Sequence, residues 1–352
     1  MVKVGIIANP ISARDIRRVI SHAGNLPIND RANIVLRMMT GLAACGVDEV
    51  VVMPEHGGIR FQLERSIQRE ARLGHMSLPH VRYLDMPVTA TPADSARAAR
   101  MMAEEGVAAI VVLGGDGTNR VVVAACGQVP VAGVSTGTNN AFPELREPTI
   151  TGLAVGIAAT GQVPEAEAVR PNKWLEVTLN DRREIALVDV AVVEDRFVGA
   201  RAIWKATGFR DIFVTFGLPQ AIGMSSIAGL CDPVDRATPE GRHIRLSPDA
   251  PRQLLAPIAP GLIDRVGIAG TERMLPGVDH HPSISAGSLA FDGERELTFT
   301  EGDRVSVRIV PGAFRTIDVP ACMAYAVEAG LFIRTPDEAT KGGAHVQPVS
   351  PR

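Results

Sequence analysis

A glycine-rich pentapeptide that contains a single acid is the segment of this chain best suited to chemistry. It reads Gly114-Gly115-Asp116-Gly117-Thr118 and directly follows an apolar run, 108–113, that we expect to be a buried β-strand. Glycines at the end of a strand let the backbone approach phosphate oxygens closely, and the free N–H groups of a following helix can bind them. The Thr118 hydroxyl can donate a further hydrogen bond. The segment therefore predicts a phosphate-binding turn between a strand and a helix.

Asp116 is the unusual member of this turn, because a carboxylate would weaken a loop that binds only anions. It implies either a metal ion held against phosphates or a base that activates a hydroxyl group. The alternative is a tight turn in which Asp116 caps the helix. The turn is neither a dinucleotide fingerprint, since G-x-G-x-x-G is absent, nor a Walker loop, since no Gly-Lys-Ser/Thr follows. Phosphoryl transfer suits these residues, because it needs mainly a phosphate cradle, a divalent cation and a proton acceptor.

A second pair of acids could also supply the base. Asp292 and Glu294 lie in the sequence Phe-Asp-Gly-Glu, shortly before an apolar run at 297–300. The Asp-Gly dipeptide is equally typical of a type I′ hairpin turn. The sequence leaves open whether Asp116 or the pair of Asp292 and Glu294 acts as the base.

The elements around the pentapeptide alternate between strands and helices. Strands are expected at 2–8, 47–53, 81–84 and 108–113, and helices at 15–20, 29–45 and 92–105. This alternation is typical of a doubly wound, Rossmann-like α/β domain, which we place at residues 1–160. In such folds ligands bind at the carboxyl ends of the strands, where the pentapeptide lies.

The second half of the chain has a different pattern, with many strands and few helices. Strands are expected at 174–180, 184–193, 200–204 and 305–310, and the Pro-, Arg- and Asp-rich stretch 232–260 is expected to be an irregular loop. We place a β-rich, sandwich-like substrate domain at 161–315 and a C-terminal segment at 316–352. That segment contains a helix at 320–331, expected to pack back on the first domain, and a mobile tail after Pro336.

Composition excludes several classes of protein. The 36 Lys and Arg residues against 39 Asp and Glu give a net charge of −3, which offers no concentrated positive surface for nucleic acid. No apolar run approaches the ~20 residues of a membrane span. The four cysteines have no paired spacing, which fits reduced thiols, and the first residues do not resemble an export signal. We therefore expect a cytoplasmic protein with small-molecule substrates, no nucleic-acid partner and no membrane span.

Residues 114–118 resemble the signature of the superfamily that joins NAD kinases, diacylglycerol kinases and sphingosine kinases. Residues 133–137 resemble the NAD-kinase segment Gly-Ile-Asn-Thr-Gly, and residues 137–142 resemble the lipid-kinase segment Gly-Thr-x-Asn-Asp-Phe, with Ala141 in place of the acid. The pair Asn9-Pro10 recurs in both branches as part of the nucleotide-binding edge. The resemblance implies an NAD kinase/diacylglycerol kinase-like fold.

Three later segments also carry the resemblance. Residues 186–190 occupy the place of the NAD-kinase segment Ala-Leu-Asn-Glu-Val, with Val188 replacing the Asn while an acid remains as Asp189. The run Asp-Gly-Glu at 292–294 resembles the lipid kinases. Residues 223–229 resemble the Ser/Thr/Gly-rich substrate loop of NAD kinases, or else form a helix packed through small residues. This mixture is similar to the ATP-NAD kinase-like group called acetoin catabolism protein X.

The resemblance implies an ATP- and Mg²⁺-dependent kinase. Its acceptor would be NAD, through the adenosine 2′-hydroxyl, or a related small hydroxylated metabolite linked to acetoin catabolism. Alternatives are a lipid or polyol kinase and a nucleotide-sensing protein without turnover. A homo-oligomer, a dimer or tetramer, is also expected.

The expected site residues fall into three groups. The catalytic residues are Asp116, Asp292 and Glu294; the nucleotide-binding residues are Asn9, Pro10, Gly114, Gly115, Gly117, Thr118, Thr136, Gly137, Thr138 and Asn140; the substrate-binding residues are Asp189, Gly223, Ser225 and Ser226. No motif binds a metal directly, and Mg²⁺ would arrive with ATP and be held through Asp116.

Other chemistry-bearing residues are interpreted as structural or left open. Arg14, Arg17 and Arg18 face either a triphosphate or solvent, and Trp174 and Trp204 are expected to pack in the β domain. Adjacent histidine side chains point apart, so the Asp279-His280-His281 run is expected to be a surface loop and not a metal site.

Overall fold

A computed structural model gives the fold of residues 1–10, 26–74, 77–137, 140–194 and 208–333, apart from the side chain of Arg295. Several sequence-based expectations lie outside these described residues: the helix at 15–20 with Arg14, Arg17 and Arg18, the residue Thr138, the strand at 200–204 with Trp204, and the tail after Pro336.

The first sheet begins with a parallel half. Among the described residues this sheet has nine strands in the order β3-β2-β1-β4-β5-β16-β6-β7, with β13 paired to β16 off that path. Its parallel strands are β1 (Lys3–Ala8), β2 (Glu49–Val52), β3 (His80–Tyr83), β4 (Ala109–Gly114) and β5 (Val131–Ser135). The order 3-2-1-4-5 is that of a doubly wound α/β fold, which confirms the expected class for the first half.

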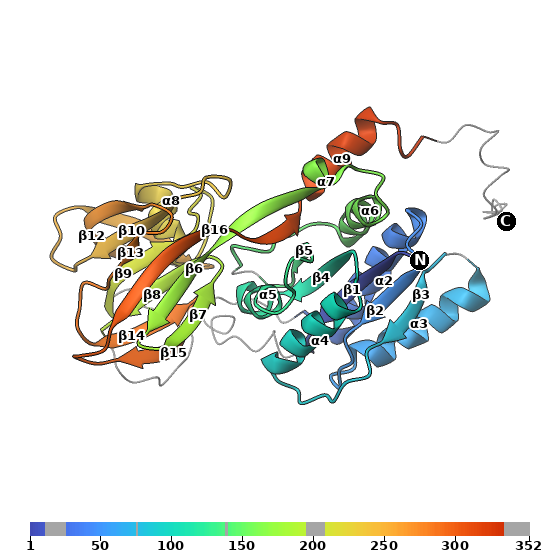
Figure 1. Ribbon diagram of the computed structural model, residues 1–352, viewed down its shortest axis with the longest axis horizontal. Coiled ribbons are helices and arrows are strands. Elements are labelled where there is room, and N and C mark those ends of the chain that lie inside the picture. Colours follow the sequence, from blue (N-terminus) through green and yellow to red (C-terminus); the bar gives the residue numbers. More distant parts are fainter. Residues whose placement is uncertain (11–25, 75–76, 138–139, 195–207, 334–352) are drawn as a thin grey trace.

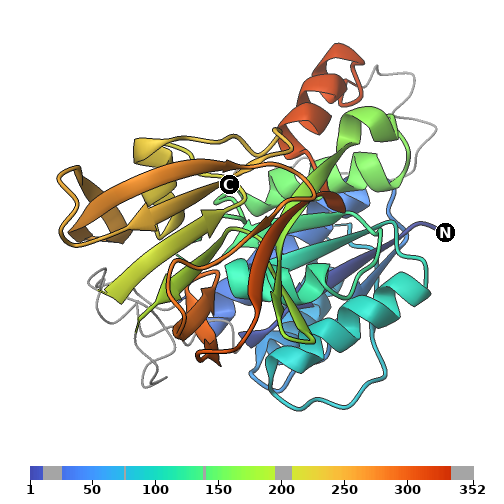
Figure 2. The same cartoon turned by 60° about the vertical axis from the view of Figure 1, so that its left-hand side comes forward.

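Helices cover both faces of the parallel strands (Figure 1). One face packs against α2 (Ile28–Ala44), α3 (Ile59–Leu73), α6 (Pro148–Ala159) and α9 (Val319–Glu328), and the other against α4 (Pro92–Glu104) and α5 (Asp116–Val123). Figures 1 and 2 both show α9, in red, beside the green helix α6, although about 160 residues separate them in the chain. The short α7 (Glu165–Ala168) lies between β6 and α9.

Two long strands extend the same sheet into the second half of the molecule (Figure 1). β16 (Val305–Ile317) pairs in parallel with β5 at one end and runs antiparallel to β6 (Val169–Leu179) over most of its length. β7 (Arg182–Ala186) completes this antiparallel part, and the two-residue β13 (Asp279–His280) pairs with β16. The two halves that the sequence pattern distinguishes therefore share one continuous sheet.

The second sheet is antiparallel and has the order β11-β12-β10-β9-β8-β14-β15. Its strands are β8 (Asp189–Val193), β9 (Phe209–Val214), β10 (Gly241–Leu246), β11 (Gln253–Ala259), β12 (Leu262–Met274), β14 (Gly287–Phe291) and β15 (Glu294–Phe299). One face packs on β6, β7 and β16, and the other is covered in part by α8 (Ser225–Cys231). This confirms a β-rich, sandwich-like second half.

Two of the expected elements are wrong in detail. The stretch 232–260 is not an irregular loop, because it contains β10 and β11. Arg242 and His243 of β10 are buried with partners, so the polar sequence conceals a strand. Pro257 is tolerated because β11 is an edge strand. The expected strand 184–193 is two strands, β7 and β8. They are separated at Leu187 and Val188, whose N–H groups donate to the Asp292 carboxylate instead of to a neighbouring strand.

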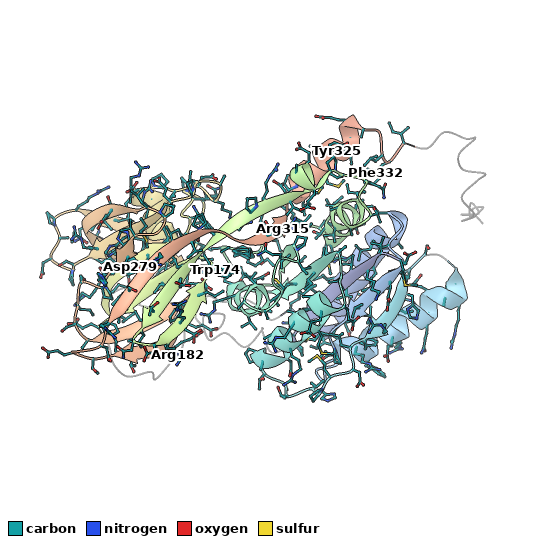
Figure 3. All side chains as sticks on the ribbon, viewed as in Figure 1. Trp174, Arg182, Asp279, Arg315, Tyr325 and Phe332 are labelled. Atoms are coloured by element: carbon teal, nitrogen blue, oxygen red, sulfur yellow. The ribbon has the colours of Figure 1, made fainter. Side chains whose placement is uncertain are left out.

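Trp174 packs as expected, at the place where the two halves meet (Figure 3). It lies on β6, and its ring stacks on Phe314 of β16 with 6.3 Å between centroids. Phe314 in turn meets Phe142 at 5.7 Å. None of the described helices is both long and apolar enough to cross a membrane.

Candidate active site

The glycine turn joins β4 to α5. β4 ends at Gly114, and Asp116 is the first residue of α5. A Cβ atom on Gly114 would lie 2.6 Å from the Thr118 Cβ, and one on Gly115 would lie 2.6 Å from the Asn140 Oδ1. A Cβ on Gly117 would meet no atom of the described residues within 4 Å. The first two positions therefore require glycine for internal packing, whereas Gly117 faces open space at the N-terminus of a helix, where an anion can be bound.

The Asp116 carboxylate joins this turn to the segment after β5. It accepts hydrogen bonds from the backbone N–H groups of Ala141 and Phe142, at 2.8 to 3.2 Å. The side chain is half-buried, so part of it remains open to solvent. The structure thus joins the 114–118 turn to Ala141 and Phe142, which directly follow Asn140, another residue expected to bind nucleotide.

Side chains on both segments hold this arrangement. Asn140 donates from Nδ2 to the Ser135 Oγ at 2.8 Å, and Ser135 Oγ donates to the carbonyl of Gly137 at 3.0 Å. Asn119, which sequence reasoning missed, donates to the Gly115 carbonyl at 2.9 Å, and its Oδ1 is buried without a hydrogen-bond partner among the described residues. Thr136 and Gly137 are half-buried directly after β5.

The pair Asn9-Pro10 lies at the same edge of the sheet. β1 pairs with β4 so that Ala8 lies opposite Leu113, which places Asn9 beside Gly114. Asn9 is buried and donates from Nδ2 to the Thr91 carbonyl and the Ser95 Oγ, at 3.2 and 3.1 Å. Its side chain therefore binds the N-terminus of α4.

Asp292 lies in a two-residue hairpin turn between β14 and β15. Asp292 and Gly293 have φ angles of +49° and +84°, as a type I′ turn requires, so the hairpin interpretation of Asp-Gly is correct. The Asp292 carboxylate has no exposed surface and accepts from the N–H groups of Leu187, Val188 and Asp189 at 2.8 to 3.3 Å. It therefore fixes the break between β7 and β8.

Arg120 links α5, the helix that begins at Asp116, to the hairpin that carries Asp292. Its Nε lies 3.6 Å from the Asp292 Oδ2, it also pairs with Glu296, and its guanidinium lies 5.5 Å from the centre of the Phe291 ring. Burial raises the pKa of Asp292, and Arg120 and the three N–H donors oppose that shift. Arg120 follows Asp116 by four residues, about 6 Å along a helix, so the same helix that begins at Asp116 contacts Asp292 one turn later.

Asp189 and Glu294 lie near Asp292, which faces Arg120. Asp189 is buried, and its carbonyl accepts from the Asp292 N–H at 2.9 Å. Glu294 is half-buried at the start of β15. Both are therefore close to Asp292, as expected.

Arg236, which sequence reasoning missed, joins the second half to the turn. Its guanidinium donates to the carbonyls of Phe142, at 3.0 Å, and Ala141, the two residues whose N–H groups bind Asp116. It lies 4.1 Å from the centre of the Phe216 ring, and burial lowers its pKa. No local pattern marks this residue, since its partners are about 95 residues away in the chain.

The expected substrate residues at 223–226 occupy a different environment. Ser225 and Ser226 have no exposed surface, and the Ser226 Oγ donates to the Gly223 carbonyl at 2.7 Å. α8 begins here and packs against β9 and β11. This favours the alternative, a helix packed through small residues, and within the described chain no hydrogen bond joins these serines to the 114–118 turn.

The parallel sheet, the Gly-Gly-Asp-Gly-Thr turn and the antiparallel second half define the class of NAD kinase-like proteins. Residues 4–162 match the family model of the ATP-NAD kinase N-terminal domain, and residues 173–313 match that of the acetoin catabolism protein X C-terminal domain. The chain is 52% identical over 347 residues to acetoin catabolism protein X of Cupriavidus necator, covering 96% of each. The chain belongs to the acetoin catabolism protein X family.

A solved structure from Bacillus anthracis str. Sterne, assigned as a diacylglycerol kinase, is also similar. It is 14% identical, with a TM-score of 0.43, and the similarity covers 90% of this chain and 96% of that one.

Proposed function

We propose that the chain is an ATP-dependent phosphotransferase that acts on a small hydroxylated acceptor. The observation that carries this proposal is the position of Asp116, a half-buried carboxylate at the N-terminus of α5 beside the open space at Gly117. A phosphate group at the helix N-terminus and a proton acceptor next to it are the two parts that phosphoryl transfer requires from the protein.

In this proposal the N–H groups at the start of α5 and the Thr118 hydroxyl bind the phosphates of ATP. The acceptor hydroxyl oxygen attacks the γ-phosphorus, the bond from that phosphorus to the β-γ bridging oxygen breaks, and ADP leaves with the electron pair. Asp116 takes the hydroxyl proton. Mg²⁺ accompanies ATP, and a carboxylate oxygen of Asp116 is the kind of ligand it prefers.

Asp292 fits a structural role better than a catalytic one. Its carboxylate is fully buried, accepts from three backbone N–H groups and faces Arg120. A base must come within about 3 Å of the acceptor hydroxyl, and Asp292 has no open surface for that approach. We therefore assign the base to Asp116 and not to Asp292.

The acceptor to test first is NAD, because residues 4–162 match the NAD kinase domain. A small hydroxylated metabolite of acetoin catabolism is the second, because the Cupriavidus relative is named for that process. A nucleotide-sensing role without turnover is favoured by one observation: Val188, at the place of the NAD-kinase Asn, is buried in the apolar core and offers no polar side chain to a substrate.

The experiment is a transfer assay with the purified full chain, ATP and Mg²⁺ against NAD, acetoin, polyols and acylglycerols. We expect phosphoryl transfer to one of these, and Asp116→Asn should lower turnover at least ~10²-fold, the scale for a positioned base. Asp30→Asn is the matched control, since Asp30 is an exposed acid in the first turn of α2. It should behave as wild type.

Three outcomes would contradict the proposal in different ways. ATP binding without transfer to any acceptor would favour the sensing role. Transfer only to acylglycerols would indicate that the chain is a lipid kinase. Normal turnover in Asp116→Asn with a large loss in folded Asp292→Asn would assign the base to Asp292.

A further inference from the structure

Three potential metal ligands converge in the second half, away from the glycine turn. His243 lies on β10, Glu272 on β12 and His280 on β13, and one ligand atom from each lies within 4.8 Å of the others. The two carboxylate oxygens of Glu272 face different imidazoles, with Oε2 3.8 Å from the His243 Nδ1 and Oε1 3.8 Å from the His280 Nδ1. The carboxylate therefore bridges the two rings.

The topology brings these residues together from both sheets. His243 and Glu272 are directly opposite each other on paired antiparallel strands of the second sheet. His280 lies on β13, which pairs with β16 of the first sheet, next to Asp279, labelled in Figure 3. His280 is buried, at 6% exposed, so the expectation of a surface loop is wrong for this residue.

A buried carboxylate fixes the protonation of His243. The Asp211 Oδ1 lies 2.8 Å from the His243 Nε2, and its Oδ2 accepts from the N–H and the hydroxyl of Ser283, both at 2.8 Å. Asp211 has no exposed surface, so this carboxylate is held in place and requires a proton on Nε2. In the neutral ring, the other nitrogen, Nδ1, then carries a lone pair.

No described residue gives that lone pair a hydrogen bond. The His243 side chain is 4% exposed, its Nδ1 is buried, and its ring is held by stacking on Phe213 with 4.2 Å between centroids. The His280 ring faces Glu272 with its Nδ1, whereas its other nitrogen, Nε2, is buried without a hydrogen-bond partner among the described residues. A buried lone pair that faces a carboxylate is unfavourable unless a cation or a proton lies between them.

We propose that His243, Glu272 and His280 bind one divalent transition-metal ion of the Zn²⁺ type. Two imidazoles and a carboxylate are a ligand set that Zn²⁺ accepts, and Mg²⁺ prefers oxygen ligands alone. The Asp211-to-His243 bond is the carboxylate-to-histidine contact that typically orients a metal-bound imidazole. The inference does not depend on the proposed phosphotransferase activity.

The distances suit such an ion once the side chains move closer together. Two ligands about 2.1 Å from a tetrahedral ion lie about 3.4 Å apart. The two 3.8 Å separations involve different oxygens of Glu272, and one ligand atom of each residue lies within 4.8 Å of the others, so the ligands must close in to bind one ion. Glu272 can supply these shifts, because its side chain is 54% exposed. With three protein ligands, water completes the coordination on the solvent side of Glu272. The ion would link β10 and β12 of one sheet to β13 of the other.

The test is Zn²⁺ binding by the full chain after treatment with a chelator, measured by competition with a chromophoric chelator. We expect one equivalent of Zn²⁺ to bind in the presence of millimolar Mg²⁺ and to raise the thermal unfolding midpoint. Glu272→Gln should weaken binding by at least ~10²-fold, since losing a direct ligand exceeds the ~10–100-fold effect of losing an outer partner. Glu272 is exposed, so this variant should fold.

Two further variants complete the test. His280→Gln should lose binding as Glu272→Gln does. His281→Gln is the matched control and should bind as wild type, because the neighbouring His281 is exposed and its Nδ1 contacts the Val305 carbonyl. Absence of Zn²⁺ binding at ~10 μM, or equal binding by wild type and Glu272→Gln, would overturn the proposal and leave a proton, not a metal ion, between the imidazoles and Glu272.

Discussion

Asp116 and Asp292 are both carboxylates that accept backbone hydrogen bonds, and they lie in two different parts of the molecule. Each carboxylate accepts backbone N–H groups from a distant segment, Asp116 from residues 141–142 and Asp292 from residues 187–189. Asp116 is half-buried at a helix N-terminus, whereas Asp292 is fully buried in a hairpin turn against Arg120. A hydrogen-bonded carboxylate can therefore act on a substrate only where one side of it remains accessible, as at Asp116.

The largest expected effect is on stability, and it separates the two acids. Asp292→Ala would remove one of the two carboxylates that Arg120 faces and leave three interior N–H groups without their acceptor, so we expect a loss of about 3–5 kcal/mol in the free energy of unfolding. Asp116→Ala should cost only about 1 kcal/mol, because water can replace it. Urea unfolding of both variants measures this, and equal losses would remove the distinction.

Substitution of Arg236 tests whether the second half of the chain positions the turn that carries Asp116. Arg236→Met keeps much of the side-chain volume but removes the donors to the carbonyls of Ala141 and Phe142. Buried charged hydrogen bonds contribute about 1.5–3 kcal/mol, so we expect a comparable loss of stability together with a raised KM for ATP. Unfolding and kinetics on the same samples check this. An unchanged KM would mean that the second half does not influence the turn.

Two glycines of the turn should respond in opposite directions. Gly115→Ala places a Cβ 2.6 Å from the Asn140 Oδ1 and should destabilise the fold by about 1–3 kcal/mol. Gly117→Ala meets open space within α5 and should stabilise the fold by up to about 1 kcal/mol. It should nevertheless weaken ATP binding, because the methyl group occupies the proposed phosphate position. Normal ATP affinity in Gly117→Ala would place the phosphates elsewhere.

The smallest expected effect is a pH dependence of stability that arises from Lys173 on β6, the strand shared by both halves. Its ammonium donates to the carbonyls of Asp235, Thr238 and Glu240 at 2.5 to 2.9 Å. Burial lowers the pKa of Lys173 to about 8 from 10.5, so between these values the unfolded chain binds the extra proton. Stability should therefore rise with pH across this window.

The comparison for Lys173 is Lys173→Met, followed by urea unfolding from pH 7.5 to 10.5. The stability of wild type relative to Lys173→Met should increase as the pH rises through this range. A constant difference would mean that the carbonyls hold the charged form as well as water does.

The elements of the first half were predictable because their patterns are local. The strand at 108–113, the helix at 29–45 and the turn at 114–118 each depend on neighbouring residues, and the structure has them within a few residues as β4, α2 and the β4-α5 junction. The Asp-Gly hairpin was predictable for the same reason.

The contacts that complete the site were not predictable from one sequence. Arg120, Arg236 and Lys173 each bind residues more than 60 positions away, and a single sequence carries no signal for such pairs. His280 was also missed, although Glu272 and His243 are nearer in the chain, because the three residues meet only through the pairing of strands from two sheets. Its neighbour His281, which points away, made the pair look like a surface loop.

The strand β16 has a consequence for the synthesis of the chain on the ribosome. The first half alternates strands and helices up to residue 159, yet its sheet is extended beyond β5 only by β16, which ends at Ile317. Until that strand has left the ribosome, β5 presents an unpaired edge, and β6 lacks the partner that runs along almost its whole length. The nascent chain must therefore be synthesised past Ile317 before its first sheet can close.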